Sequence, residues 1–251
     1  MPKRPTSHPA GASALPTTVT TDIEVRAAKV AVLPVGAFEQ HGPHLPLVTD
    51  TLIATAIASD IAERHQLLQL PPITMACSHE HAAFPGTVSI SATTLAALIA
   101  DITASLTGQG VRALLLVNAH GGNYALSNIV QQSTVSGPCM GLYPSRQDWD
   151  DARQAAGMAS TAHEDMHAGE LETSILLARY PDYLRAGWDT DDHVADDRRQ
   201  LTTRGVAAYS QSGVIGLPSN ATAAKGHTAL RQLAQNSDSI INIFTENTIT
   251  E

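Results

Sequence analysis

Short apolar runs and longer amphipathic stretches alternate along this chain. The run at 113–117 is wholly apolar and does not alternate with polar residues, which is typical of a strand covered on both faces of a parallel sheet. Runs at 29–35 and 139–143, and a shorter one at 67–70 that two prolines end, have the length of strands. The pattern therefore predicts four strands.

Between these runs, apolar side chains recur at the three- and four-residue spacing of a helix face. The first such stretch covers 51–64 and has Thr49 or Asp50 available as its N-cap. Further helices are expected over 91–106, 124–132, 171–179 and about 221–244, the last interrupted near Gly226. This βαβα order predicts an α/β fold, a three-layer α/β/α sandwich around a mainly parallel sheet.

Composition narrows the classes of partner. The chain has 251 residues and a formal net charge of −9, which argues against a general nucleic-acid or acidic-membrane binder. No apolar run reaches the roughly 20 residues that cross a membrane. We expect a flexible arm over 1–21, rich in Pro, Ser, Thr and Ala, and one domain over 22–251. Cys77 and Cys139 are too few for a disulfide framework, which predicts reduced thiols in a cytoplasmic protein.

The first cluster of chemistry-bearing residues directly follows the strand at 29–35. Glu39 and His41 are two positions apart, so an extended backbone directs both side chains to the same face. Asp50 follows a turn-rich span that could fold back beside them. Two carboxylates and an imidazole at a strand end are ligands that a divalent metal site needs.

A second cluster follows the strand at 113–117 and contains His120, Gly121 and Gly122. The glycines allow a tight turn from strand to helix and leave room for a ligand or a metal. Because ligands collect at the carboxyl ends of parallel strands, His120 meets Glu39 if the two strands are parallel neighbours. Taken alone, a histidine after a strand such as His120 is more often a hydrogen-bonded structural residue than a ligand. A nucleotide site has little support, since no GxGxxG or Walker lysine follows.

Two further clusters are rich in histidines and carboxylates. The segment 163–174 places two histidines and four acidic residues ahead of an apolar helix. These acidic residues could point inward, or could be only favourable charge near a helix N-terminus. The segment 78–81 also looks metal-like, but adjacent residues of a loop rarely all face one ion. We therefore expect 78–81 to line a pocket.

Taken in order, these motifs resemble the signature of the creatininase (creatinine amidohydrolase) family. The resemblance is carried by residues 39–46 with 49–50, by 84–87, by 118–123, and by 167–169 with 172–174. It covers roughly residues 30–225. The family implies an α/β sandwich around a parallel sheet, usually a homohexamer, and a two-metal site that uses zinc, manganese or iron.

Carried over by motif, the resemblance assigns a metal ligand role to four residues. Glu39 would bind one metal, His41 the other, and Asp50 would bridge both. His120 would join the Glu39 metal. The expected hydrogen-bond partners of the two histidine rings are Asn118, Asn123 or His44.

The last ligand differs from that of creatininase itself. Creatininase has a glutamate where this chain has Gly122, which puts creatinine in doubt as the substrate and indicates a Gly-Gly branch of the family. The resemblance implies that a glutamate of the later motif takes its place, Glu172 in the first instance and Glu170 as the alternative. His167 matches the position that the family uses near the reacting group, and His167 and Glu172 are the expected catalytic residues. The expected substrate-binding residues are Ser78, His79, Glu80, Gly121, Gly122 and Trp149.

The resemblance implies a metal-dependent amidohydrolase in which two divalent metal ions activate water. The expected reaction is hydrolysis of a non-peptide or cyclic C–N amide bond of a small molecule. Three alternatives stay open: a peptidase that trims the mycofactocin precursor peptide, a formamide deformylase, and a metal-binding protein that has lost catalysis. The stretch 84–90 is similar to the peptidase branch. The expected partner is thus a small molecule or a short peptide.

Overall fold

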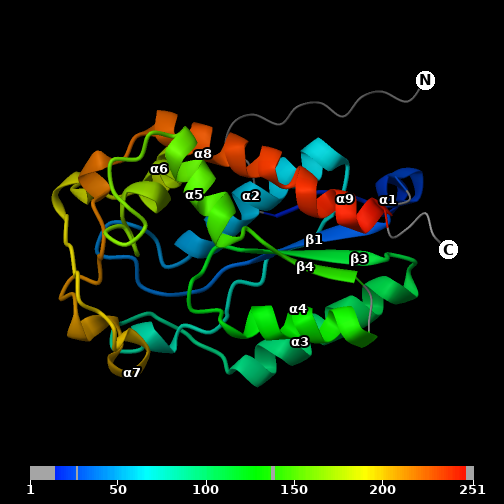
Figure 1. Ribbon diagram of the computed structural model, residues 1–251, viewed down its shortest axis with the longest axis horizontal. Helices are drawn as coiled ribbons and strands as arrows, with labels where there is room; N and C mark the ends of the chain where they lie inside the picture. Colours follow the sequence, from blue (N-terminus) through cyan, green and yellow to red (C-terminus); the bar gives the residue numbers. More distant parts are fainter. Residues whose placement is uncertain (1–14, 27, 137–138, 247–251) are drawn as a thin grey trace.

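A computed structural model describes residues 15–26, 28–136 and 139–246. Its centre is a parallel four-stranded sheet in the order β2-β1-β3-β4 (Figure 1). The strands are β1 (Val30–Val35), β2 (Leu68–Gln69), β3 (Ala113–Asn118) and β4 (Cys139–Tyr143). The four predicted strands are confirmed.

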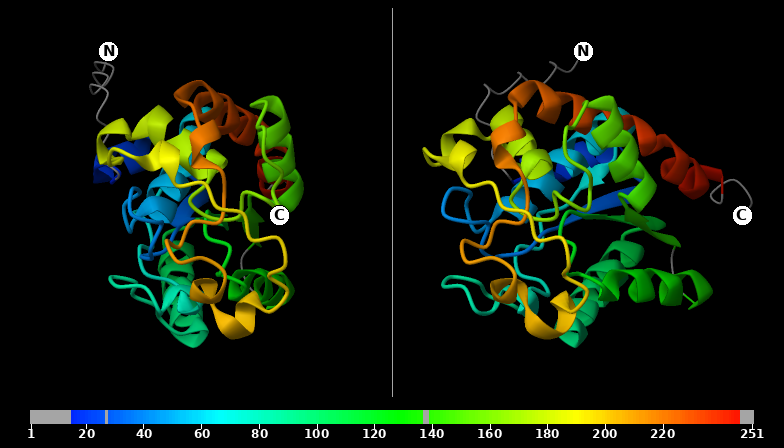
Figure 2. Two further views of the ribbon diagram at one scale, coloured as in Figure 1. Left: turned by 90° about the vertical axis from the view of Figure 1, so that its left-hand side faces the viewer. Right: turned by 60° about the vertical axis from the view of Figure 1, so that its left-hand side comes forward.

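Helices cover both faces of this sheet (Figures 1 and 2). One layer consists of α3 (Ala92–Gly108) and α4 (Ala125–Ser136). The opposite layer contains α2 (Thr49–His65), α5 (Arg146–Ala155), α6 (Glu170–Arg179), α8 (Ala223–Asn236) and α9 (Asp238–Glu246). The remaining α-helices of the described ranges are the short α1 (Thr20–Arg26) and α7 (Leu201–Arg204). The predicted α/β/α sandwich is confirmed.

Each face of the sheet has its own hydrophobic core. Val32 and Leu115 pack with residues of α2, α6 and α8, whereas their chain neighbours Leu33 and Leu116 pack with Ile99 of α3 and its surroundings. Successive strand residues point to opposite faces, so a strand buried on both sides must be apolar at every position. This explains the apolar runs of β1 and β3.

Two helix boundaries differ from the prediction. No side chain caps the start of α2, where Val48 holds the N-cap position, so the N-cap role expected for Thr49 or Asp50 is wrong. The last helix divides at Ser237 and not near Gly226. Gly226 instead lets α8 approach α6, because a Cβ there would lie only 1.9 Å from the backbone oxygen of Ser174.

The apolar pattern alone does not predict α5. Its signal is the spacing of Ser145 and Asp148, which form a reciprocal capping box at the start of the helix. In the predicted arm, residues 1–14 lie outside the described part of the chain, and α1 begins at Thr20. Among the helices of the described ranges, none combines the length and apolarity that crossing a bilayer requires.

Candidate metal centre

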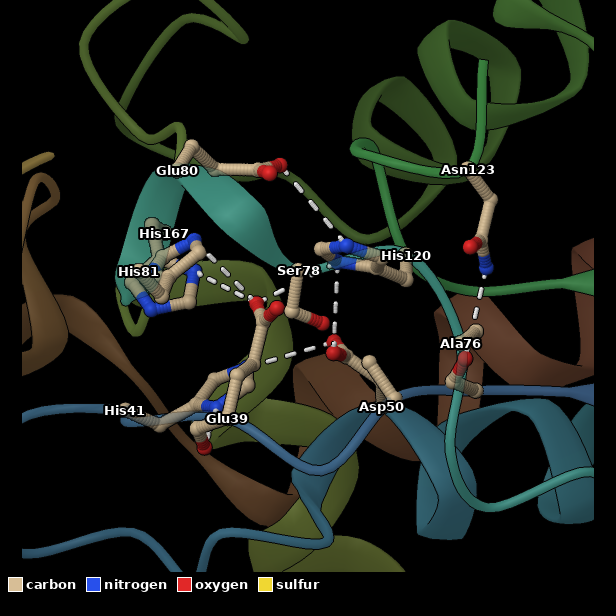
Figure 3. Close-up of polar contacts among 12 residues, drawn as sticks. Glu39, His41, Asp50, Ala76, Ser78, Glu80, His81, His120, Asn123 and His167 are labelled. Atoms are coloured by element: carbon tan, nitrogen blue, oxygen red, sulfur yellow. Dashed lines mark hydrogen bonds and ion pairs between the residues drawn. The ribbon is translucent and has the colours of Figure 1, made fainter. Parts of the chain in front are cut away.

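The pairing of β1 with β3 positions the candidate site. Val35 pairs with Asn118, so the two strands end at the same level. Glu39 and His41 follow β1 and His120 follows β3, while the chain returns over the sheet edge to place Asp50 in the first turn of α2. Figure 3 shows these four side chains converging.

The distances are those of a compact cluster. His120 Nδ1 lies 3.2 Å from Glu39 Oε1 and 3.4 Å from Asp50 Oδ2. His41 Nε2 lies 3.2 Å from the other carboxylate oxygen of Asp50, Oδ1. All four side chains are at most 4% exposed. The structure therefore brings the first two predicted clusters together.

Two groups of possible metal ligands share Asp50. Glu39, Asp50 and His120 each offer one ligand atom within 4.8 Å of the others, and so do His41, Asp50 and Glu172. Both carboxylate oxygens of Glu39, and Oδ2 of Asp50, are buried without a hydrogen-bond partner in the described part of the chain. Buried carboxylate oxygens normally have a partner, so this donor set fits a pair of divalent cations.

The electrostatics of the cluster favour positive charge. Burial lowers the pKa of His41, but the charges of Asp50, Glu172 and Glu39 raise it to about 10 overall. Burial also opposes protonation of His120, yet Glu39 and Asp50 raise its pKa to about 9. Burial raises the pKa of the Glu172 carboxyl to about 7. Without metal, protons would therefore occupy positions where cations fit.

Backbone carbonyl groups orient the two metal-facing rings. His41 Nδ1 donates to the backbone oxygen of Glu39 at 3.1 Å, and His120 Nε2 donates to that of Cys77 at 2.8 Å. Each ring thus carries its proton on the outer nitrogen and turns the other nitrogen toward the carboxylates. This is the arrangement in which an imidazole binds a metal.

The partners expected for these rings have other contacts. Asn118 Nδ2 donates to the backbone oxygen of His120 at 2.8 Å, and Asn123 Nδ2 donates to Asn118 Oδ1 at 2.9 Å. His44 Nε2 lies 3.9 Å from Asp191 Oδ2. The two asparagines therefore fix the loop after β3, and neither they nor His44 orient the metal-facing rings.

Glu172 reaches the cluster and Glu170 does not. Glu172 Oε2 lies 3.9 Å from His41 Nε2 and accepts the backbone N–H of Ala168 at 2.6 Å. Glu170 instead pairs with Lys225 Nζ at 2.5 Å and accepts the backbone N–H of Ser160 at 2.8 Å. Of the two glutamates that the sequence leaves open, the geometry favours Glu172.

His81 belongs to the cluster, which the sequence did not indicate. It is 3% exposed, and its Nε2 lies 3.2 Å from Glu39 Oε1. A 3₁₀ turn over His79–His81 directs His81 inward and leaves His79 exposed, with its ring bonded to Ser89 at 3.1 Å. The neighbours in this segment therefore do not all face one site, as expected: His79, Glu80 and His81 line hollows, and of the two histidines His81 reaches the cluster. Burial lowers the pKa of His81 to about 3, so its ring is neutral.

His167 lies over the cluster with one nitrogen available. Its Nε2 donates to the backbone oxygen of Gln40 at 2.7 Å, and its Nδ1 lies 3.9 Å from Glu39 Oε1. Its ring centroid is 4.2 Å from that of His41. Burial, followed by the charge of His41, holds the pKa of His167 well below its ordinary value. A neutral ring with an unprotonated Nδ1 can accept a proton, or can serve as a further ligand with Glu39 and His41.

Three adjoining hollows lead to the cluster. The inner hollow, about 120 Å³, is lined by the cluster and by Gly121, Gly122 and Tyr124. A second hollow, about 180 Å³, shares His120 and His167 with it and extends to Trp149. A third, about 430 Å³, shares Glu80, Gly122 and Tyr124 with it and extends to His79.

The predicted substrate-binding residues all lie near the metal-ligand cluster, but Ser78 differs from the other five in its surroundings. His79, Glu80, Gly121, Gly122 and Trp149 line these hollows. Ser78 is fully buried beside the carboxylates of Glu39 and Asp50 (Figure 3), and its hydroxyl has no partner in the described ranges.

The absence of a side chain at Gly122 has a steric reason. A Cβ there would lie 2.0 Å from Glu80 Oε1 and 2.4 Å from His120 Nε2. At Gly121, by contrast, a Cβ would meet nothing within 4 Å. The carboxylate of Glu80 thus occupies the space that a side chain at 122 would need.

Comparisons with known proteins show which family and fold the chain is similar to. A sequence model of the creatininase family, described as creatinine amidohydrolase, matches residues 17–241. The mycofactocin precursor peptide peptidase of Mycolicibacterium smegmatis is 35% identical over 218 residues, which cover 81% of each chain. The creatinine amidohydrolase of Pseudomonas putida is 33% identical over 178 residues, covering 62% of this chain and 66% of that protein. A crystal structure of creatinine amidohydrolase (creatininase) has a TM-score of 0.77 at 26% identity and covers 91% of this chain and 96% of that one.

Proposed function

The chain belongs to the creatininase family of hydrolases, and we propose that it is a two-metal enzyme that hydrolyses a peptide amide bond. The observation that carries the proposal is the pair of ligand groups that share Asp50. Both carboxylate oxygens of Glu39, and Oδ2 of Asp50, have no hydrogen-bond partner among the described residues, which supports the proposal because such buried atoms are costly without a cation.

Five residues are proposed as ligands of the two metal ions, and Asp50 is shared by both. Glu39, Asp50 and His120 would hold one ion, and His41, Asp50 and Glu172 the other. Carboxylate and imidazole ligands suit zinc, manganese and iron. When bound, the pair of ions supplies activation of water at neutral pH and polarisation of the substrate carbonyl.

His167 is the proposed proton-handling residue. Its Nε2 is held by the backbone of Gln40, which leaves Nδ1 without a proton and directed toward the cluster. In this position Nδ1 can take a proton from the attacking water and return it to the leaving nitrogen. The lowered pKa of His167 means that the ring is unprotonated before the reaction.

A peptide is the substrate that the surroundings favour. The second and third hollows extend from the inner one, so an elongated molecule can lie across the cluster. Tyr124 is 65% exposed where the inner and third hollows meet, and offers an aromatic surface to a substrate side chain. The relative that matches 81% of the chain is a precursor peptide peptidase.

A small amide is the second candidate. The inner hollow of about 120 Å³ suits a small molecule, and the chain is also similar to a creatinine amidohydrolase. Creatinine itself is disfavoured, because Glu80 fills the space beside Gly122 that a glutamate would need.

The test compares substrates on metal-loaded protein. Metal analysis by mass spectrometry should find about two ions per chain. Release of a C-terminal fragment from a mycofactocin-type precursor peptide, without turnover of creatinine or formamides, supports the peptidase. Hydrolysis of small amides alone would select the second candidate. If the protein binds two ions but hydrolyses none of these peptides or amides, the proposed function is refuted.

We also propose a cytoplasmic homohexamer. The hexamer is what the family resemblance implies, and the cytoplasm is proposed because two cysteines in 251 residues are too few for a disulfide framework. Light scattering on the purified protein measures the oligomer directly.

A further inference from the structure

We propose that His81 is a further catalytic residue, whose Nε2–H donates a hydrogen bond to the carbonyl oxygen of the substrate as negative charge develops on that oxygen. The inference rests on the proposed amide hydrolysis. It requires that the proton of the neutral His81 ring is on Nε2. The contacts of the Gln40 side chain determine this.

The amide of Gln40 has a single orientation. The backbone N–H of Gly42 donates to Gln40 Oε1 at 2.9 Å, and Gln40 Nε2 donates to the backbone oxygen of Gly213 at 3.2 Å. A peptide N–H cannot accept a hydrogen bond and a carbonyl oxygen cannot donate one. The oxygen and nitrogen of this amide therefore cannot be exchanged.

This orientation fixes the tautomer of His81. The second hydrogen of Gln40 Nε2 is directed at His81 Nδ1, 2.8 Å away. His81 Nδ1 must therefore accept, and in the neutral ring the proton is on Nε2. An Nε2 that carries a proton cannot bind a metal, so His81 presents a donor to the site and is not a ligand.

The amide of Gln40 also determines which ring nitrogen of the neighbouring His167 carries the proton. His167 Nε2 lies 3.1 Å from Gln40 Nε2, whose two hydrogens are already used, and 2.7 Å from the backbone oxygen of Gln40. His167 Nε2 is therefore a donor to that oxygen. The rings of His81 and His167, 4.4 Å apart, share one tautomer but offer opposite nitrogens to the cluster: an N–H from His81 and a lone pair from His167.

The N–H of His81 is available to a substrate. His81 lines the inner hollow together with Glu39, Asp50 and His120. Glu39 Oε1 lies 3.2 Å from Nε2, but no hydrogen bond is completed between them in the described structure. A buried, preoriented donor beside the proposed metal ligands is suited to an oxygen that becomes negative during the reaction.

The first experiment reads the tautomer without turnover. Protein with ¹⁵N-labelled histidines is loaded with zinc, and two-bond ¹H–¹⁵N correlations identify the protonated nitrogen of His81, assigned with the His81→Gln variant. A proton on Nε2 is expected. A proton on Nδ1, or zinc bound at Nε2, would overturn the inference.

The second experiment measures kinetics and zinc content together. His81→Leu should lower kcat by roughly 10²- to 10³-fold with zinc content retained. His81→Gln, which keeps an N–H donor, should lose less. Gln40→Glu removes the donor to His81 Nδ1 and should switch the tautomer and lower kcat. His65→Gln, whose ring contacts Ser237 away from the cluster, is the matched control.

The outcomes separate the two proposals. If His81→Leu keeps wild-type kcat, or loses its zinc, His81 does not act as a substrate donor. If the wild-type enzyme with two ions hydrolyses no amide, the proposed function fails instead.

Discussion

Lys225 Nζ lies 2.5 Å from Glu170 Oε1, and this ion pair separates the structural glutamate of α6 from the one that faces the cluster. Glu170 and Glu172 are two residues apart, so they point in directions roughly 200° apart around the helix. Glu170 therefore anchors α6 to α8, while Glu172 faces His41.

This difference predicts opposite results for two matched variants. Glu172→Gln should lower the metal content by about one ion per chain and leave stability nearly unchanged, since it removes one proposed ligand. Glu170→Gln should keep both ions but lower the free energy of unfolding by about 1–3 kcal/mol, because it removes the charged partner of Lys225. Metal analysis and urea unfolding measure the two quantities. Loss of metal from Glu170→Gln alone would reverse the assignment.

Asp50 is the residue on which both ions depend. Asp50→Asn keeps the shape of the side chain but halves its capacity as a bridging ligand. We expect both ions to bind more weakly and kcat/KM to fall by on the order of 10³-fold, the equivalent of several kcal/mol of lost Lewis-acid assistance. Calorimetric titration with zinc, followed by peptide assays, checks this. Two tightly held ions with full turnover would refute the bridging role.

The raised pKa values predict how pH affects the metal-free protein. His41 and His120 have folded pKa values of about 10 and about 9, above the ordinary 6.5. Between pH 6.5 and pH 10 the folded state therefore binds more protons than the unfolded state. The stability that these protons provide is fully present below pH 6.5 and is lost as the pH rises toward 10.

The melting temperature of chelator-treated protein should accordingly fall by at least about 3 °C between pH 7 and pH 9.5. Zinc-loaded protein should show a smaller fall, since cations replace the protons, and zinc affinity should increase over the same range. Differential scanning fluorimetry gives both curves. A metal-free melting temperature that rises with pH would contradict the prediction.

Adjacent glycines provide a steric test. Gly122→Ala places a Cβ 2.0 Å from Glu80 Oε1 and 2.4 Å from the fixed ring of His120, whereas Gly121→Ala meets nothing within 4 Å. Gly122→Ala should destabilise the protein by about 1–3 kcal/mol and weaken metal binding. Gly121→Ala should change stability by less than about 0.5 kcal/mol. Equal effects in urea unfolding would show that Glu80 moves aside freely.

His167 can be tested without removing its anchoring bond. His167→Gln retains an N–H that can reach the backbone oxygen of Gln40, but removes the basic Nδ1. We expect kcat to fall by about 10²- to 10⁴-fold while the metal content stays at the wild-type level. If the metal content falls as well, His167 is a ligand with Glu39 and His41 instead.

The parts of the site that the sequence predicts are those attached to strand ends. Glu39, His41 and His120 follow apolar runs, and the parallel pairing of β1 with β3 brings them to one edge. Asp50 is predicted for the same reason, because the chain must return from that edge into α2. The fold follows from the same runs, since strands buried on both faces leave a strong apolar signal.

The remaining features depend on directions that a linear pattern does not contain. His81 points inward because a 3₁₀ turn rotates it away from His79, and Gln40 contacts it across 41 positions of sequence. The choice between Glu170 and Glu172 depends on how α6 is rotated toward α8. The break lies at Ser237, whereas Gly226, the apparent weak point, is needed for helix contact.

The matched ends of β1 and β3 have a practical consequence for anyone who refolds this protein. A slip of one residue would shift Glu39 past His120 by about 3.3 Å and reverse which side of the sheet each strand residue faces. Ions could then no longer be shared between the two chain segments. The stoichiometry of bound metal would consequently serve as a readout of correct strand pairing, available before any substrate is known.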